Sequence, residues 1–355
     1  MNIRTFFLGM IAFLSTSTAF AQTEFNISQV TAINTGDGRL LFREREDEKT
    51  LTGQFRLIDG YKTEYILADF TDGFYNGSYE FFKYNKLNEK GSYKEGRKDG
   101  KWIKYFSDGQ TIESETYLKE GKLDGICKTY FTDGKIESEK GYKNGLEHGK
   151  ELRYDYETGK LKVDANFVDG KAEGKQTRYI QSNKGEYIQV SNYKNGNQTG
   201  EYTETYIKGK PKKKGFYKEG KKDGIWIEYR KDGIPENEVN YKGGRKNGKT
   251  TVYYTNGSVE KIIHYVDDAK EGVSQEFDYN SGKLKSEYNF SDNKKEGNYK
   301  LFYDDGTLRE EGRCVDGDIV YRKEYYKSGQ LKEIREYTGN GWETIESYDS
   351  DGKQK

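Results

Sequence analysis

The chain of 355 residues contains 60 acidic and 60 basic side chains, so its balance gives no basic surface of the kind that holds nucleic acid or anionic lipid. Only 32% of its residues are hydrophobic, and 32 Tyr and 18 Phe supply much of that fraction. This composition excludes a thick aliphatic core and favours a thin sheet covered by aromatic rings, while the aromatic content argues against disorder.

Residues 1–21 have the order of features of a signal peptide. Arg4 precedes a short apolar run from Phe6 to Leu14, and Ala19-Phe20-Ala21 places small residues where a signal peptidase reads them. The apolar run is too short to span a bilayer. We therefore expect cleavage before Gln22 and export to the periplasm, the cell surface or the extracellular space.

Residues 22–69 form a less regular segment. Within it, Gly53 and Asp59-Gly60 indicate a degenerate first hairpin. Terminal units of a repeat array are atypical caps, so we expect this segment to cap the N-terminal end of an array.

Residues 70–337 carry three series of glycines that recur about every 24 residues and keep step with one another. The first series is Gly73, Gly96, Gly121, Gly145, Gly170, Gly196, Gly220 and Gly244. The second, four residues later, is Gly77, Gly100, Gly125, Gly149, Gly174, Gly200, Gly224, Gly248, Gly272 and Gly297. The third includes Gly109, Gly134, Gly233, Gly257 and Gly306. A period in this range indicates a repeat architecture, with about ten to eleven units here.

Each unit is expected to be one β-hairpin. Glycines of the third series follow Asp or Asn, and such pairs between aromatic and β-branched runs predict the turn from an outgoing to a returning strand. Asp268 and Asn293 replace glycine in the first series, which indicates a backbone with φ > 0. The second series is expected to open each outgoing strand.

The returning strands alternate in polarity, as in Leu161, Val163, Ala165 and Phe167, which predicts one packed face and one wet face. Pro211 and Pro235 fall at the expected starts of returning strands, where a missing N–H costs least. Aromatic residues occupy slots of both parities on the outgoing strands, so the inner face of those strands is left open. Residues 338–355 read as a C-terminal cap or tail.

The unit Tyr-x-x-Gly-x-x-x-Gly-x-x-x-x-Tyr, followed by Asp-Gly and a strand ending in an aromatic residue, resembles the bacterial variant of the MORN repeat. The resemblance covers about Phe70 to Tyr337. It implies an all-β fold, an elongated single sheet of stacked antiparallel hairpins. Many bacterial proteins with this variant are grouped with the YwqK-like antitoxins, which implies an inhibitor of a partner protein.

Candidate catalytic groups are few. His148 and His264 lie in separate repeats and read as surface variants, and the acidic pairs recur with the repeat as a solvated face. Cys127 and Cys314 lie too far apart along the stack to form a disulfide, and Cys314 occupies an aromatic slot as a small buried residue. We therefore expect no enzyme, no cofactor and no metal site.

Our leading hypothesis is an exported, non-catalytic scaffold that binds a protein or a cell-envelope polymer along its sheet. The candidate partner-binding surface is Trp102, Tyr105, Tyr130, Tyr154, Tyr179, Trp226, Tyr229 and Tyr253. Nucleic acid, a transmembrane segment and membrane-surface binding are not expected. The alternatives are a carbohydrate-active enzyme with Trp102, Trp226 and Trp342 as sugar platforms, and an antitoxin-like inhibitor. Because Trp102 and Trp226 share one repeat slot, packing is the better explanation for them.

Overall fold

The computed structural model describes residues 23–183 and 185–355, so the expected signal peptide lies outside the described residues. Two compact units divide the described chain. One runs to Glu137 and includes Tyr142–Gly145, and the other comprises Ser138–Gly141 and Leu146–Lys355. Apart from one 3-10 turn, the regular structure of the described residues consists of β-strands.

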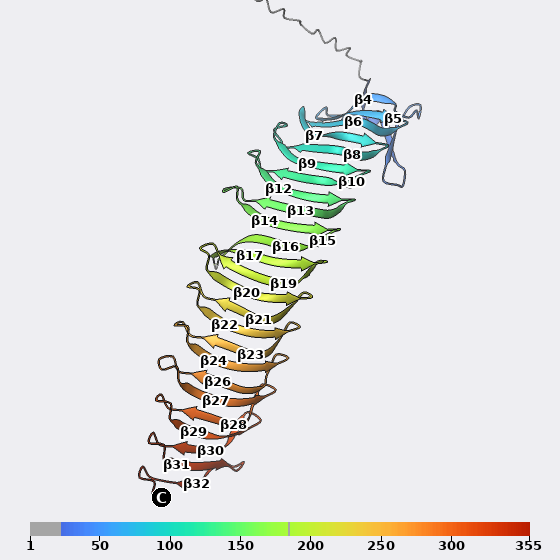
Figure 1. The fold of residues 1–355 in the computed structure, drawn as a ribbon. Helices are drawn as coiled ribbons and strands as arrows, with labels where there is room; N and C mark the ends of the chain where they lie inside the picture. Colours follow the sequence, from blue (N-terminus) through green and yellow to red (C-terminus); the bar gives the residue numbers. More distant parts are fainter. Residues whose placement is uncertain (1–22, 184) are drawn as a thin grey trace, which may run out of the picture. The chain divides into compact units, whose positions relative to one another are not determined.

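The first unit contains eleven complete strands and the 3-10 turn, coloured blue to green in Figure 1. Their bounds are β1 (Thr23–Asn26), η1 (Ile27–Gln29), β2 (Val30–Asn34), β3 (Leu40–Glu44), β4 (Gly53–Ile58), β5 (Glu64–Thr71), β6 (Phe74–Lys83), β7 (Lys86–Lys94), β8 (Arg97–Tyr105), β9 (Ile112–Lys119), β10 (Lys122–Leu123) and β11 (Gly125–Tyr130). β12 (Ile136–Lys143) lies at the division between the units. From β4 to β11 each strand pairs antiparallel with the next along the chain, except that β10 and β11 both pair with β9.

The N-terminal end of this unit holds its thickest core. β1 pairs in parallel with β4, and β2 with β3 forms a separate two-stranded sheet. The buried side chains of this core are Val30, Phe42, Leu51, Phe55, Leu57, Ala68 and Phe70. The Phe42 N–H donates to the Gly73 carbonyl (2.7 Å), and the Gly73 N–H donates to the Leu51 carbonyl (2.8 Å). The hairpin β2–β3 is thereby tied to the start of the repeats.

The second unit continues the same plan through twenty strands, coloured green to red in Figure 1. Their bounds are β13 (Leu146–Tyr154), β14 (Leu161–Val168), β15 (Lys171–Ala172), β16 (Gly174–Ser182), β17 (Gly185–Lys194), β18 (Asn197–Gln198), β19 (Gly200–Tyr206), β20 (Pro211–Lys218), β21 (Lys221–Tyr229), β22 (Pro235–Lys242), β23 (Arg245–Tyr253), β24 (Val259–Val266), β25 (Ala269–Lys270), β26 (Gly272–Phe277), β27 (Leu284–Ser291), β28 (Lys294–Phe302), β29 (Leu308–Val315), β30 (Asp318–Tyr325), β31 (Leu331–Tyr337) and β32 (Trp342–Ser347). The all-β fold class is therefore confirmed: in each unit the hairpins join side by side into an open sheet. The parallel pair β1–β4 makes the sheet mixed.

The first glycine series forms tight two-residue turns between a returning strand and the next outgoing strand. Glu95 (φ 50°) and Gly96 (φ 80°) both have positive φ, as a type I′ turn requires. The Gly96 N–H also donates to the Tyr75 carbonyl of the preceding repeat (2.8 Å). The predicted positive φ is confirmed, including at Asp268 (φ 72°) and Asn293 (φ 70°).

Asp268 and Asn293 add a contact that glycine cannot make. Each side-chain oxygen accepts a backbone N–H of the preceding repeat, from Lys246 (2.8 Å) and Lys270 (2.9 Å) respectively. The two substitutions therefore keep the turn and strengthen the connection between neighbouring repeats.

The Asp-Gly pairs close the opposite end of each hairpin, as predicted. At Asp133-Gly134 the Gly134 N–H donates to the Phe131 carbonyl (2.9 Å), and the Phe131 N–H donates to the Lys135 carbonyl (2.9 Å). Only the glycine has positive φ (83°), so this is a three-residue turn with a glycine bulge. Pro211 and Pro235 are the first residues of β20 and β22, as expected.

The expectation that the second glycine series opens the outgoing strands holds in four repeats, where β11, β16, β19 and β26 begin at Gly125, Gly174, Gly200 and Gly272. In the other repeats the glycine lies inside a longer strand. Gly100 (φ 79°) lies inside β8, where the register with β7 shifts, and β10 and β11 are interrupted just before Gly125. These glycines accommodate a bulge. In several repeats an Asn side chain bonds a strand carbonyl near this bulge, as Asn240 does to Lys249 (Nδ2···O, 3.0 Å).

A central row of side chains fills one face of the sheet by matching large residues to small ones. Trp102 and Trp226 are 2% and 3% exposed. Each lies against a glycine, Gly91 or Gly215, at which an added Cβ would stand 2.3 or 2.2 Å from the indole ring. Each indole Nε1–H donates to a backbone carbonyl, of Ser92 or Phe216 (3.0 Å in both cases).

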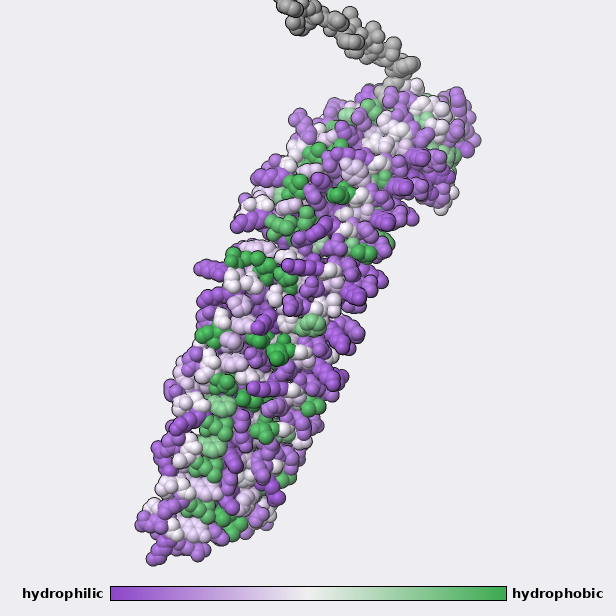
Figure 2. Space-filling view, in the orientation of Figure 1, coloured by the Kyte–Doolittle hydropathy of each residue, from purple (hydrophilic) through white to green (hydrophobic). Residues whose placement is uncertain are grey.

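The faces are less distinct than the alternating pattern predicts. Ala165 is fully buried, whereas Leu161 on the same strand face is 44% exposed. Beyond the central row, most side chains of both faces are half-buried because a single-layer sheet has no second layer to cover them. In Figure 2 hydrophobic residues form small patches among hydrophilic ones.

Tyrosine hydroxyls connect successive repeats at the Asp-Gly end. Those of Tyr254, Tyr303 and Tyr326 each donate to the backbone carbonyl of a residue one repeat further on, at 2.8 to 2.9 Å. The accepting residues are Phe277, Tyr325 and Tyr348. The sequence left open which face of the sheet these tyrosines occupy, and the structure shows that their hydroxyls hold neighbouring repeats together.

Candidate functional site

The eight residues of the predicted partner-binding surface lie on two faces of the sheet. Trp102 and Trp226 are buried in the central row, where Trp102 packs on Tyr79 and Tyr93. Tyr105 (9% exposed) lies on the opposite face under the Lys90 ammonium. The structure thus places the two tryptophans in the packing role that their shared slot favours.

The six tyrosines of that prediction follow one slot of the outgoing strands, on the face opposite the tryptophans. Tyr130, Tyr154, Tyr179, Tyr229 and Tyr253 are half-buried. Tyr130 and Tyr253 each hydrogen-bond a glutamate of a neighbouring returning strand, Glu115 or Glu238, and burial raises both phenol pKa values. These rings therefore form part of a polar, cross-linked surface.

A second feature of the second unit combines cations and aromatic rings. The first residue pairs are Tyr217 with Lys222 and Tyr241 with Lys246, each directly opposite across two antiparallel strands. The same pairing recurs at Tyr265 with Lys270 and Phe290 with Lys295. We call these eight residues the lysine–aromatic ladder.

Each lysine of the ladder except the last also reaches the aromatic ring of the next repeat. The Nζ atoms of Lys222, Lys246 and Lys270 lie 4.8, 5.0 and 5.2 Å from the ring centroids of Tyr241, Tyr265 and Phe290. Lysines and rings therefore alternate without interruption from β20 to β28. All eight side chains are half-buried, so the ladder is accessible along its length.

The ladder carries four positive charges. None of its four ammonium groups forms an ion pair with a carboxylate within the described part of the chain. Burial lowers the pKa of Lys222, the ammonium groups of Lys213 and Lys246 lower it further, and the Glu228 carboxylate opposes them. Lys213 itself pairs with Glu228 (2.7 Å). An anion would find an open electrostatic site here.

The sequence contained a signal for the ladder that composition concealed. Lysine occurs two residues after the first-series position in four consecutive repeats, as Lys222, Lys246, Lys270 and Lys295. An aromatic residue precedes the same position by three residues in each. Because the whole chain is neutral, net charge gave no indication of this local stripe.

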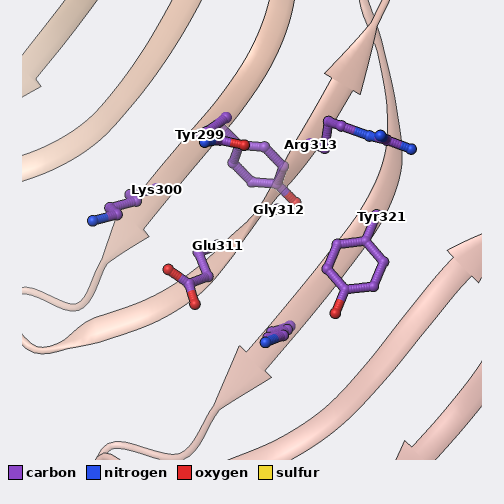
Figure 3. Close-up of a pocket in the computed structure, with 8 residues that line it drawn as sticks. Tyr299, Lys300, Glu311, Gly312, Arg313 and Tyr321 are labelled. Carbon is purple, nitrogen blue, oxygen red and sulfur yellow. The ribbon is translucent and has the colours of Figure 1, made fainter.

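A pocket of about 460 Å³ lies between β28, β29 and β30. It is lined by Tyr299, Lys300, Glu311, Gly312, Arg313 and Tyr321, among others. Figure 3 shows the Lys300 and Arg313 side chains pointing in opposite directions. These two basic groups therefore do not converge on one point in the pocket.

The remaining chemistry-bearing residues are separate from one another. His264 Nδ1 lies 2.7 Å from the Val273 carbonyl, in the slot that Asn240 occupies in its own repeat, and His148 faces Asp169 (3.3 Å). Both cysteines are free, and Cys314 is 1% exposed. Within residues 23–183 and 185–355, no group of three His, Cys, Asp or Glu side chains is placed to hold a metal, and no helix is long and apolar enough to cross a membrane.

Comparison with known proteins supports the repeat assignment. The family model described as MORN repeat variant matches residues 123–144, 222–242, 246–267, 295–313 and 321–338. No curated protein matches the chain. One solved structure that aligns with 91% of the chain, a Tc holotoxin pore from Photorhabdus luminescens, is 14% identical with a TM-score of 0.19, and the chain spans 19% of its length. At that TM-score the match supports neither a fold nor a function. Repeats of the MORN variant are therefore present at intervals from residue 123 to residue 338 of this chain.

Proposed function

We propose that this protein is an exported, non-catalytic scaffold that binds an extended macromolecule along one face of its hairpin sheet. The observation that supports this most is the lysine–aromatic ladder, in which one chemical pattern repeats across the strands from β20 to β28. A single catalytic centre needs several different groups converging on one reacting atom. A ladder instead offers the same contact several times, which suits an extended partner.

Charge and shape make the ladder the binding face. Its ammonium groups form no direct ion pair in the described residues, unlike those of Lys213 and Lys101, and its four lysines recur in register with aromatic rings. The aromatic rings hold the lysine stems in place, so little side-chain entropy remains to be lost on binding. Export follows from the signal-peptide features of residues 1–21 and is part of the proposal.

The test is capture of partners from the envelope fraction of the producing cell with the immobilised chain. A variant with Lys246→Glu and Lys270→Glu should lose the captured material, because two adjacent sites become repulsive. The matched control is Lys249→Glu with Lys300→Glu, which makes the same charge change at exposed positions on the opposite face. Loss of capture in the control, with retention in the ladder variant, would refute the assignment of the face.

The enzymatic alternative is tested with the same preparations. Turnover on a panel of polysaccharides that depends on one Asp or Glu would replace the scaffold proposal. An antitoxin-like role would instead give one protein, captured in a stoichiometric complex, whose own activity the chain inhibits.

A further inference from the structure

We propose that the lysine–aromatic ladder binds a linear acidic polysaccharide, with one carboxylate or sulfate group at each lysine. This inference rests on the proposed function and names the class of its ligand. It comes from the spacing, the charge and the rigidity of the four lysines.

The spacing follows from the sheet. The four lysines lie one repeat apart, on the outgoing strands β21, β23, β25 and β28 of successive repeats (Figure 1). One returning strand lies between neighbouring lysine-bearing strands, so two strand spacings, roughly 9.6 Å, separate the lysine backbones. An extended polysaccharide with one charge per disaccharide presents anions at a similar interval, so its repeat can stay in register with all four lysines.

An acidic peptide fits this interval less well. Side chains on one face of an extended peptide recur at about 6.7 Å, so they lose register with the lysines within one repeat. A polyproline II peptide would come closer, at about 9.3 Å per turn, but only with an acidic residue at every third position. In a stiff glycan the covalent repeat fixes the spacing of the anionic groups, and little conformational entropy is lost on binding.

The chemistry of the ladder suits a sugar chain as well as an anion. Each ammonium group stands beside at least one aromatic ring, which offers apolar edges to the C–H groups of a sugar. The rings nearest to Lys246, Lys270 and Lys295 are Tyr265, Phe290 and Tyr288. Lys222 contacts two rings, with its Nζ 4.5 Å from the Trp226 ring centroid and 4.8 Å from that of Tyr241.

The experiment measures binding of the full chain to hyaluronan oligosaccharides of increasing length, which carry one carboxylate per disaccharide. Affinity should rise with each added disaccharide up to four and then level off. Oligosaccharides with reduced carboxyl groups should not bind. Added salt should weaken binding because the contacts are ionic and exposed.

Variants locate the site. Lys246→Glu with Lys270→Glu should lower affinity by up to about fivefold per lysine, the contribution of an exposed ion pair. Lys246→Arg with Lys270→Arg should retain binding, and Lys249→Glu with Lys300→Glu should leave it unchanged. Circular dichroism and thermal unfolding show whether each variant is folded.

Several outcomes overturn the proposal. Equal binding of all oligosaccharide lengths, no binding of any, or tighter binding of polyglutamate than of the glycan would each refute it. If the glycan series fails while the ladder variants still lose partners from the envelope fraction, only the ligand class is wrong and the scaffold function stands. If neither experiment responds to the ladder variants, both proposals fall.

Discussion

Replacing Gly215 with alanine should destabilise the second unit strongly, although alanine adds only one methyl group. Its Cβ would stand 2.2 Å from Cδ2 and 2.4 Å from Cε2 of Trp226, where carbon atoms ordinarily keep about 3.5–4.0 Å. The indole ring must therefore move by more than about 1 Å. That movement is opposed by burial, since Trp226 is 3% exposed, and by its hydrogen bond to the Phe216 carbonyl.

The magnitude follows from these contacts. Overpacking of a filled site costs about 1–3 kcal/mol, and loss of the indole hydrogen bond costs about 0.5–1.5 kcal/mol. Alanine also restricts the unfolded chain, which offsets about 0.4–1 kcal/mol. The free energy of unfolding should fall by roughly 2–3 kcal/mol at the centre of these ranges.

A compensating change tests the mechanism. Gly215→Ser alone should be at least as harmful, but Gly215→Ser combined with Trp226→Tyr should recover most of the loss. The double variant reproduces the natural pair of Ser191 and Tyr202, which are 3% and 8% exposed in the same two slots of a neighbouring repeat. Glu228 stands two residues after the substituted tryptophan, as Glu204 stands after Tyr202, whose hydroxyl donates to it.

The assay is urea unfolding followed by circular dichroism, with hydrogen exchange across β20–β22 as the local readout, because repeat arrays do not always unfold in one step. Gly60→Ala is the control, since no atom lies within 4 Å of its added Cβ. Stability of Gly215→Ala within about 0.5 kcal/mol of the parent, the range of neutral surface changes, would refute the reasoning. So would a double variant that is weaker than either single one.

Three further predictions concern the turns, the bulges and the tyrosines. Gly220 has φ 77°, so Gly220→Ala should lower the free energy of unfolding by about 1–2 kcal/mol. Gly220→Asn should lower it clearly less, because Asn293 occupies the same first-series position in another repeat. Equal losses of the two variants in chemical unfolding would contradict this. Asn240→Ala should cost about 1 kcal/mol, with faster exchange of nearby amides, whereas Asn240→His should retain stability because His264 makes the same bond. Burial and Glu89 raise the pKa of Tyr93 from 10.0 to about 12. The stability that this phenol contributes is therefore complete below pH 10 and should be lost between pH 10 and 12, with phenolate absorbance and unfolding appearing together. Ionisation of Tyr93 at pH 10 in the folded protein would contradict this.

The repeat and its turns could be predicted because the turn positions have positive φ, which glycine, aspartate and asparagine tolerate best. Positive φ at Asp268 and Asn293 and strand starts at Pro211 and Pro235 follow from single residues whose steric limits are local. The prediction for the second glycine series holds in only some repeats because a bulge inside a strand and the start of a strand both favour glycine. Which of the two occurs depends on the register with the neighbouring strand.

The candidate surface was harder to predict because it depends on pairing between repeats. Sequence spacing gave the slots of Trp102 and Tyr105 but not their opposite faces, since aromatic residues occur in slots of both parities. The packing of the Trp102 and Trp226 rings on Gly91 and Gly215 can be recognised only once the pairing of the strands is known. The ladder likewise joins Lys222 to Tyr217 across one turn and to Tyr241 across a full repeat.

Lysine labelling of the full chain with and without the bound envelope partner, read residue by residue by mass spectrometry, tests the ladder as the binding face most directly. We expect Lys222, Lys246, Lys270 and Lys295 to become protected together, while Lys249 and Lys300 on the opposite face label at the same rate as before. Protection of Lys249 and Lys300 with unchanged labelling of the ladder would contradict the proposed binding face.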